Sequence, residues 1–244
     1  MKKILSAMLS LILLSISSFA AENTSQSWYF ASKNQNDRPT LPVVNDPSVK
    51  GIGADEKVIY LTFDAGYENG NVEKTVDILK EHEVPGAFFV LRHFVEKNPE
   101  LCKKMKENGN LVCNHTSSHP CITKISEDDL KREIEELENV YRDLTGYEMD
   151  RYFRPPEGTY SEEALRRVSN LGYRTVFWSL AWADWDNNNQ KTPEYAMGKI
   201  MPRIHNGTIL LLHPTSDTNT KILGEMISSL KEKGFRFASL EELW

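Results

Sequence analysis

The chain has 244 residues, of which 35 are acidic and 29 are lysine or arginine, so its formal net charge is −6. This acidic balance excludes a typical nucleic-acid partner, because proteins that bind nucleic acids present clustered basic side chains to the phosphates. Hydrophobic residues make up 40% of the chain, and no internal repeat or low-complexity block interrupts it. The composition therefore favours one domain with a full core.

The first 20 residues have the layout of a secretory signal peptide. Two lysines precede an apolar stretch over residues 4–16, and the small residues Ala20 and Ala21 mark the expected cleavage site. About 14 apolar residues are short for a membrane span, so no span is expected after cleavage. Loss of the two lysines moves the net charge from −6 to −8. The sequence thus predicts a secreted protein of the cell envelope, with a polar extension over residues 21–55 and one domain over residues 56–244.

Strand-like and helix-like segments alternate along this domain. Ser126 and the three acids after it are typical of a helix start, and Gly146 follows the last residue of the same periodic stretch. Helices are predicted over residues 72–79, 98–109 and 126–146, and from Ser161, Thr192 and Asn219. Short β-branched or aromatic runs predict strands over residues 58–63, 86–91, 110–114, 152–154, 174–179, 208–212 and 235–238.

About seven β/α units with short links favour a parallel sheet. Polar residues follow the ends of several predicted strands: Asp64, His115, Arg154, Asp184 and His213. In a β/α barrel these ends converge on one mouth, whereas an open sheet would spread them apart. We therefore predict an α/β fold, a distorted TIM-like (β/α) barrel of about seven strands.

His115 and His119 are four residues apart and can reach one divalent ion from a single turn. The spacing alone is weak evidence, because most such pairs are solvated or packed. The glutamate of the His-Glu-x-x-His metalloprotease helix is absent, since Thr116 follows His115. Another residue must supply the carboxylate.

Three cysteines, Cys102, Cys113 and Cys121, make an odd number in an exported chain. At least one thiol must be free or pair with another molecule, and no single disulfide can be assigned. Cys113 and Cys121 flank the two histidines, where a thiolate ligand is conceivable, but a buried thiol is the more common state.

Five motifs in a fixed order carry a resemblance to a known family. They are Thr-Phe-Asp-Ala-Gly at residues 62–66, His-Thr-Ser-Ser-His-Pro at 115–120, Arg-Pro-Pro-Glu-Gly-Thr-Tyr at 154–160, Asp-Trp at 184–185 and Leu-Leu-His at 211–213. The chain resembles the polysaccharide deacetylases, the NodB-homology family or carbohydrate esterase family 4. Within it, Thr-Phe-Asp-Ala-Gly-Tyr-Glu-Asn-Gly at 62–70 and the tryptophan-rich run at 178–185 most resemble the peptidoglycan N-acetylmuramic acid deacetylases of muramic δ-lactam formation in spore formers.

The resemblance implies a role for each polar residue in the hydrolysis of a linear amide. Asp64 is expected to be the general base, and His213 the general acid that protonates the leaving amine. Asp184 would orient the ring of His213, Arg154 would position Asp64, and the backbone N–H of Tyr160 would help to hold the oxyanion.

His115 and His119 would bind a divalent metal ion, Zn²⁺ first, with Mn²⁺, Co²⁺ or Mg²⁺ as alternatives. The family usually has a second aspartate directly after the base, but this chain has Ala65 there. We therefore expect a weakly held, exchangeable ion. Trp182 and Trp185 are expected to stack on a sugar, whereas Trp178, inside a predicted strand, is expected in the core.

The predicted function is the removal of N-acetyl groups from N-acetylmuramic acid in peptidoglycan, feeding δ-lactam formation in the spore cortex. The expected partners are peptidoglycan glycan strands, and the protein is expected to be a monomer in the cell envelope, with the forespore intermembrane space as one location. Two alternatives stay open. The substrate could be N-acetylglucosamine or a chitin-like polysaccharide, or the protein could be an inactive binder of wall glycan.

Overall fold

The computed structural model describes residues 24–30 and 37–244. The predicted signal peptide and residues 21–23 and 31–36 of the extension lie outside the described residues. Within the described ranges, no helix is both long and apolar enough to span a membrane.

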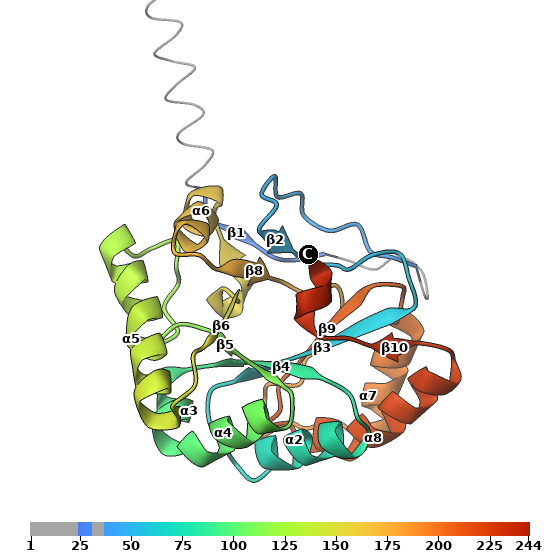
Figure 1. Cartoon of the computed structure of the whole chain (residues 1–244). Coiled ribbons are helices and arrows are strands. Elements are labelled where there is room, and N and C mark those ends of the chain that lie inside the picture. The colour runs from blue at the N-terminus through green and yellow to red at the C-terminus, as the bar shows by residue number, and fades with distance from the viewer. Residues whose placement is uncertain (1–23, 31–36) are drawn as a thin grey trace, which may run out of the picture.

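A curled parallel sheet forms the centre of the domain (Figure 1). β3 pairs with both β4 and β9, and beyond the end of β8 Leu180 forms a bridge with Leu210. The sheet therefore curls back on itself, which confirms the predicted α/β fold with a distorted barrel. Its strands are β2 (Val49–Lys50), β3 (Val58–Ala65), β4 (Gly86–Val90), β5 (Leu111–Asn114), β6 (Asp150–Phe153), β8 (Arg174–Val176), β9 (Thr208–Leu212) and β10 (Arg236–Phe237). All but β2 match predicted strands.

Helices surround the outside of the sheet (Figure 1). The helices of the domain are α2 (Val72–Glu81), α3 (Arg92–Lys97), α4 (Pro99–Glu107), α5 (Glu127–Thr145), α6 (Glu162–Asn170), α7 (Pro193–Ile200) and α8 (Asp217–Glu232), with 3-10 turns η1 (Pro156–Gly158), η2 (Met201–Arg203) and η3 (Leu240–Leu243). The Ser126 side chain caps α5, and Gly146 ends it with a φ of 79°, a left-handed angle that favours glycine. Only α3 among the α-helices was not predicted.

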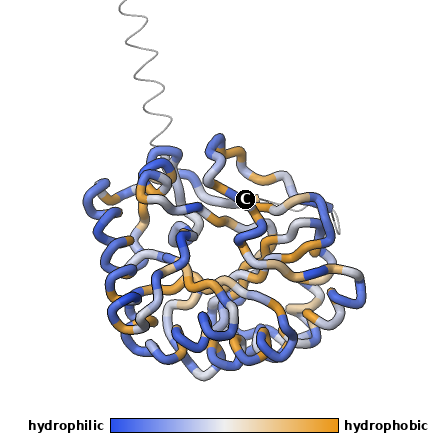
Figure 2. The backbone as a smooth tube through the Cα atoms, viewed as in Figure 1, coloured by the Kyte–Doolittle hydropathy of each residue, from blue (hydrophilic) through white to orange (hydrophobic). Residues whose placement is uncertain are grey.

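Alternating side chains along the strands create two apolar layers. Along β3, Ile59, Leu61 and Phe63 pack in the cluster that the outer helices cover, whereas Val58 and Tyr60 belong to a second cluster inside the barrel. Figure 2 shows apolar residues along the inner segments and mostly hydrophilic residues along the outer helices. The side chains at the strand ends follow the same alternation, so every second one points into the barrel.

The described part of the N-terminal extension packs onto the barrel. β1 (Gln26–Ser27) pairs antiparallel with β7 (Thr159–Tyr160), and β2 pairs with β8. The ring of Trp28 stacks on Phe177, with ring centroids 4.0 Å apart and an interplanar angle of 9°. Figure 1 shows β1 and β2 on the side of the barrel away from α2 and α4. The described residues of the extension are thus part of the folded domain, and the sequence did not predict these contacts.

All three cysteines are free, and Cys102 and Cys113 are buried. Burial raises the pKa of the Cys102 thiol to about 12 and that of the Cys113 thiol well above its usual value. These two thiols are therefore protonated at neutral pH and do not act as thiolate ligands.

Candidate active site

A cavity of about 560 Å³ opens at the carboxyl ends of the strands. Its walls combine the polar residues of the strand ends with a group of aromatic rings. The lining residues are Ser27, Trp28, Tyr29, Asp64, His115, His119, Glu157, Gly158, Trp178, Ala181, Trp182, Trp185, Leu211 and His213. The cavity is therefore the candidate active site.

The period of two along each strand explains why these side chains meet. Asp64 shares the inward face of β3 with Val58 and Tyr60, and His115 follows Leu111 and Cys113 at the same spacing. By the same rule Arg154 follows Tyr152 on β6, and His213 follows Ile209 beyond β9. Strand ends and alternation together place these side chains at one mouth of the barrel.

Asp64 and Arg154 form a buried ion pair at the base of the cavity. Arg154 Nη1 donates to Asp64 Oδ1 at 2.8 Å, and the arginine side chain has no exposed area. Its remaining nitrogens donate to Thr62 Oγ1 at 2.9 Å and to the backbone carbonyls of Val176 and Phe177 at 3.0 and 3.3 Å. Every charge-bearing nitrogen of the guanidinium is thus hydrogen-bonded, as a buried arginine requires.

Opposing influences set the ionisation of Asp64. Burial alone would raise the pKa of its carboxyl, but the charge of Arg154, with smaller favourable interactions from His115 and His213, outweighs it and holds the pKa below the usual value. Oδ1 accepts from Arg154, and Oδ2 lies 3.7 Å from His115 Nε2. The carboxylate is therefore ionised at neutral pH, and Oδ2 accepts no hydrogen bond from the described residues, which suits a proton acceptor.

The two candidate metal ligands lie on an irregular loop after β5, not on a helical turn. Asn114 Oδ1 accepts from the N–H of Thr116 at 2.9 Å, and Thr116 Oγ1 accepts from the N–H of His119 at 3.0 Å. Thr116 and His119 have φ angles of 72° and 62°, in the left-handed region that non-glycine residues rarely adopt. The side chains of Asn114 and Thr116 replace helical hydrogen bonds, so the loop turns sharply. The ring centroids of His115 and His119 are 5.0 Å apart as a result.

The side chain of Asn114, directly before His115, holds this loop in place. Its Oδ1 accepts from Thr116, and its Nδ2 donates to the Ile134 carbonyl at 3.1 Å. The side chain is completely buried. It cannot leave these contacts for the cavity without unmaking the histidine loop.

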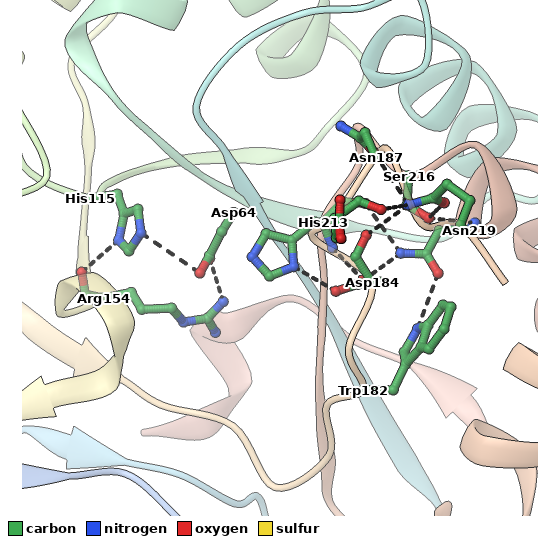
Figure 3. Close-up of polar contacts among 11 residues, drawn as sticks. Asp64, His115, Arg154, Trp182, Asp184, Asn187, His213, Ser216 and Asn219 are labelled. Carbon is green, nitrogen blue, oxygen red and sulfur yellow. Dashed lines mark hydrogen bonds and ion pairs between the residues drawn. The ribbon is translucent and has the colours of Figure 1, made fainter.

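His115 is well suited to bind a metal ion. Its Nδ1 lies 2.8 Å from the Arg154 carbonyl and must donate, so Nε2 carries the lone pair that points toward Asp64 (Figure 3). Burial lowers the pKa of His115 to about 4, against the charge of Asp64, so the ring is neutral at neutral pH. Among residues 24–30 and 37–244, no group of three or more His, Cys, Asp or Glu side chains is placed to hold a metal. The residues present fit a two-imidazole site with open positions.

On the other side of Asp64, His213 is held by Asp184 (Figure 3). Asp184 Oδ1 accepts from His213 Nδ1 at 2.7 Å, and Oδ2 accepts from the backbone N–H of His213 at 2.8 Å. Burial would lower the pKa of His213, but the hydrogen bond and charge of Asp184 outweigh it and raise the pKa above its usual 6.5. The imidazolium therefore persists to higher pH than that of a free histidine, as a proton donor near neutral pH requires.

Asn219, in the first turn of α8, links this pair to the cavity wall. Its Nδ2 donates to Asp184 Oδ2 at 2.5 Å and to the His213 carbonyl at 3.1 Å, and its Oδ1 accepts from Trp182 Nε1 at 3.2 Å. The sequence marked Asn219 only as a helix start. The signal that could have indicated a role in the site is its position at the start of a helix, six residues after His213.

The aromatic lining differs in part from the prediction. Trp182 and Trp185 line the cavity, and the Trp185 ring, which is 62% exposed, has its centroid 6.2 Å from that of the His213 ring. Their stacking on a sugar stays a prediction. Trp178 was expected in the core, and it is half-buried and packs against two core clusters. It also contributes to the cavity wall, because β8 ends at Val176, two residues before it.

Tyr160 lies outside the cavity lining. Its ring is buried against Trp28 and Phe177, its hydroxyl donates to Gln26 Oε1 at 3.2 Å, and its backbone belongs to β7, where Gln26 is its registered partner. Glu157 and Gly158 of the same loop reach the cavity instead. The oxyanion role of the Tyr160 N–H stays a prediction.

Comparisons with known proteins place this geometry in a family. The polysaccharide deacetylase family model matches residues 51–176. The chain is 44% identical over 189 residues to the peptidoglycan-N-acetylmuramic acid deacetylase PdaA of Bacillus subtilis, covering 77% of this chain and 72% of that protein. It is 31% identical over 191 residues to a peptidoglycan-N-acetylglucosamine deacetylase of Bacillus cereus, covering 76% and 68%.

A solved structure extends the match to nearly the whole fold. The structure of Bacillus subtilis PdaA, a family 4 carbohydrate esterase, superposes with a TM-score of 0.87 at 38% identity, covering 91% of this chain and 97% of that one. Sequence and fold therefore agree. The chain belongs to the polysaccharide deacetylase family, carbohydrate esterase family 4.

Proposed function

We propose that this protein removes the N-acetyl group from N-acetylmuramic acid in peptidoglycan, with the help of a divalent metal ion. One observation carries the proposal. An ionised carboxylate, Asp64, and a histidine with a raised pKa, His213, share one cavity, and a neutral histidine, His115, stands beside the carboxylate. These are the groups that amide hydrolysis needs, because water must lose a proton and the departing amine must gain one.

Each proton has a path in this arrangement. Asp64 Oδ2 accepts a proton from the attacking water, while Arg154 keeps the carboxylate in place through Oδ1. The His213 imidazolium gives its Nε2 proton to the amide nitrogen as the carbon–nitrogen bond breaks, and Asp184 stabilises the charged ring through Nδ1. The products are acetate and a free amino sugar.

The metal ion would be held by His115 and His119. When bound, it would supply Lewis-acid activation of the amide carbonyl and of the water. Ala65 has no ligating atom, so the chain provides two imidazoles and leaves the remaining positions to water or substrate. Zn²⁺ suits imidazole nitrogen, and Mn²⁺, Co²⁺ and Mg²⁺ are the alternatives to be tested.

The preference for muramic acid rests on the relatives. The protein from Bacillus subtilis with 44% identity is named for N-acetylmuramic acid, whereas the relative named for N-acetylglucosamine is 31% identical. We extend the first assignment to this chain, together with δ-lactam formation in the spore cortex, export by residues 1–20 and action as a monomer in the cell envelope. The catalytic domain is assigned to residues 56–244.

Mass spectrometry of the sugars provides the test. Purified protein is incubated with glycan strands that contain N-acetylmuramic acid, with and without stem peptides, and with each divalent metal in turn. We expect deacetylated muramic acid. Deacetylated glucosamine alone would make the protein a deacetylase of N-acetylglucosamine. Binding of the strands without release of any free amine would make it an inactive glycan binder. A chelator should abolish turnover. If a His115→Ala variant kept full turnover in the presence of chelator, the metal assignment would be contradicted.

A further inference from the structure

A second cavity, of about 350 Å³, lies beside the active site. Ala181 and Trp182 line both cavities, so the two are neighbours across one segment of chain. Its other lining residues are Ala183, Lys191, Tyr195, Lys199 and Arg203. Three cations and no acid line this cavity, although the whole chain carries a net charge of −6.

These three cations have no carboxylate partner among the described residues. Lys191 Nζ donates to Asn189 Oδ1 at 2.7 Å, and Lys199 Nζ lies 5.2 Å from the centre of the Tyr195 ring. Arg203 Nε and Nη2 each donate at 2.7 Å to backbone carbonyls, those of Lys199 and Ala181. Their charge is therefore uncompensated within residues 24–30 and 37–244, and the cavity is electropositive.

The cationic cavity is tied to the catalytic loop. Arg203 holds the Ala181 carbonyl, and Thr218 Oγ1 donates to the Lys191 carbonyl at 2.5 Å. Between these anchors, Gln190 Nε2 donates to the carbonyl of Asp184 at 3.2 Å. The guanidinium of Arg203 and the backbone of Lys191 are thus tied to the segment that carries Asp184, the carboxylate that orients His213, whereas the exposed side chain of Lys199 contacts the Tyr195 ring.

We propose that this cavity is a carboxylate-binding subsite for the glycan strand, next to the site of deacetylation. The inference rests on the proposed function. In a strand of alternating N-acetylglucosamine and N-acetylmuramic acid, the sugar rings are neutral, and the anionic group is the carboxylate of the lactyl ether or of a peptide attached to it. Lys191 and Lys199 supply ammonium donors for such a group, Arg203 supplies further positive charge, and the Tyr195 ring offers an apolar face.

Equilibrium binding measured by calorimetry tests the subsite without depending on turnover. The full chain carrying Asp64→Asn, in the presence of divalent metal, is titrated with a muramic-acid-containing tetrasaccharide with free lactyl carboxylates, and with an N-acetylglucosamine tetramer of the same length. The variant Lys191→Gln, Lys199→Gln removes two charges and leaves Arg203, which holds backbone carbonyls, untouched. Lys80→Gln, an exposed lysine in the last turn of α2, is the matched control.

We expect the double variant to weaken binding of the muramic tetrasaccharide by about tenfold or more and to leave the neutral tetramer unaffected, with no change in the control. Strands with stem peptides identify the source: weakening only without peptides assigns the subsite to the lactyl carboxylate, and equal weakening with and without peptides means that a peptide carboxylate can occupy it as well. Equal affinities for both sugars, no effect of the double variant, or no binding of the muramic tetrasaccharide would overturn the subsite. If wild-type protein releases no amine while this charge discrimination holds, the proposed function fails and the subsite stands.

Discussion

The two sides of the active site are built differently. Asp64 is fixed by Arg154, a completely buried residue whose other partners are Thr62 and two backbone carbonyls at strand ends. His213 is fixed by Asp184 on a loop, which is held in turn by Asn219 from α8. The side chain of His213 is 26% exposed, against 12% for Asp64.

This difference predicts that one side of the site contributes mainly to the stability of the fold and the other mainly to the pKa of His213. The Asp64 side places a charge pair inside the barrel, where loss of one partner leaves the other charge buried and unpaired. The Asp184 carboxylate is also buried, with 1% of its side chain exposed, but it accepts hydrogen bonds from the ring and the backbone N–H of His213 and from Asn219. An amide in its place keeps an acceptor for these donors and leaves no unpaired charge, so such a change alters the pKa of His213 more than the stability. Substitutions on the two sides should therefore differ in kind as well as in size.

The largest effect on turnover is expected from Asp64→Asn. The amide keeps an acceptor for Arg154 but cannot take a proton from water, so kcat should fall by about 100- to 10,000-fold. Release of free amine and thermal unfolding followed by circular dichroism measure the two properties. Asp77→Asn, an exposed aspartate paired with Lys104, should leave turnover unchanged. A kcat for Asp64→Asn within tenfold of the wild-type value would remove Asp64 from the base role.

Arg154→Lys should have the largest effect on stability. Lysine keeps the charge but lacks the planar fork that serves Asp64, Thr62 and the backbone at once, so we expect a loss of about 3 kcal/mol in the free energy of unfolding. Arg151→Lys, in β6 and three residues before Arg154, is the control, because Arg151 is exposed and paired with Glu138. Its cost should be below about 1 kcal/mol in denaturant unfolding. Equal losses of unfolding free energy at Arg154 and Arg151 would show that the buried ion pair contributes no more to stability than the surface pair.

The sequence predicted the fold and the meeting of these residues for a physical reason. Strand ends and the period of two are local properties, so the positions of Asp64, His115 and His213 follow from counting along each strand. The contacts of Asn219 and the N-terminal segment are not local. Whether residues 27–29 reach a cavity more than a hundred residues away depends on the pairing of β1 with β7, which no periodicity in that short segment reveals.

Trp178 shows the same limit at the level of one residue. Val176, Phe177 and Trp178 form an apolar run, and composition alone extends the strand to Ser179. The N–H of Phe177 still donates to the Lys50 carbonyl of β2, whereas the N–H groups of Ser179 and Leu180 donate to the Ile209 carbonyl of β9. Where a strand stops is decided by its neighbours, so the sequence placed this tryptophan in the core.

Asp184→Asn should act through pH. In the wild-type protein Asp184 raises the pKa of His213 above 6.5, and the acid must be protonated to work, so activity should persist above pH 6.5 and fall as pH rises through the raised value. Without the carboxylate, burial is opposed less and the pKa falls, so the alkaline limb of kcat should move to lower pH. The stabilisation from this pair is likewise fully present below pH 6.5 and lost as pH rises through the folded pKa.

Asn219→Ala is a milder change on the same side. It removes the amide that holds Asp184 in position for His213, and the link to Trp182, but keeps the carboxylate. A less well oriented carboxylate supports the imidazolium less, so the alkaline limb of kcat should move in the same direction, to lower pH, by a smaller amount. Turnover across a pH series, compared for both variants, measures the order. A larger displacement for Asn219→Ala than for Asp184→Asn would mean that Asn219 acts on His213 by a route other than Asp184.

The smallest effect is expected from the N-terminal segment, at Tyr29. This residue lines the cavity yet is 78% exposed and belongs to neither side of the acid–base machinery. Tyr29→Ala should raise KM by about fivefold, the value of one lost aromatic contact, and leave kcat unchanged because the chemistry lies deeper. Tyr147→Ala, at an exposed tyrosine just after α5, should change neither constant. A fall in kcat with constant KM would instead mean that the extension shapes the reacting geometry, since an edge contact with substrate cannot discriminate between ground and transition states.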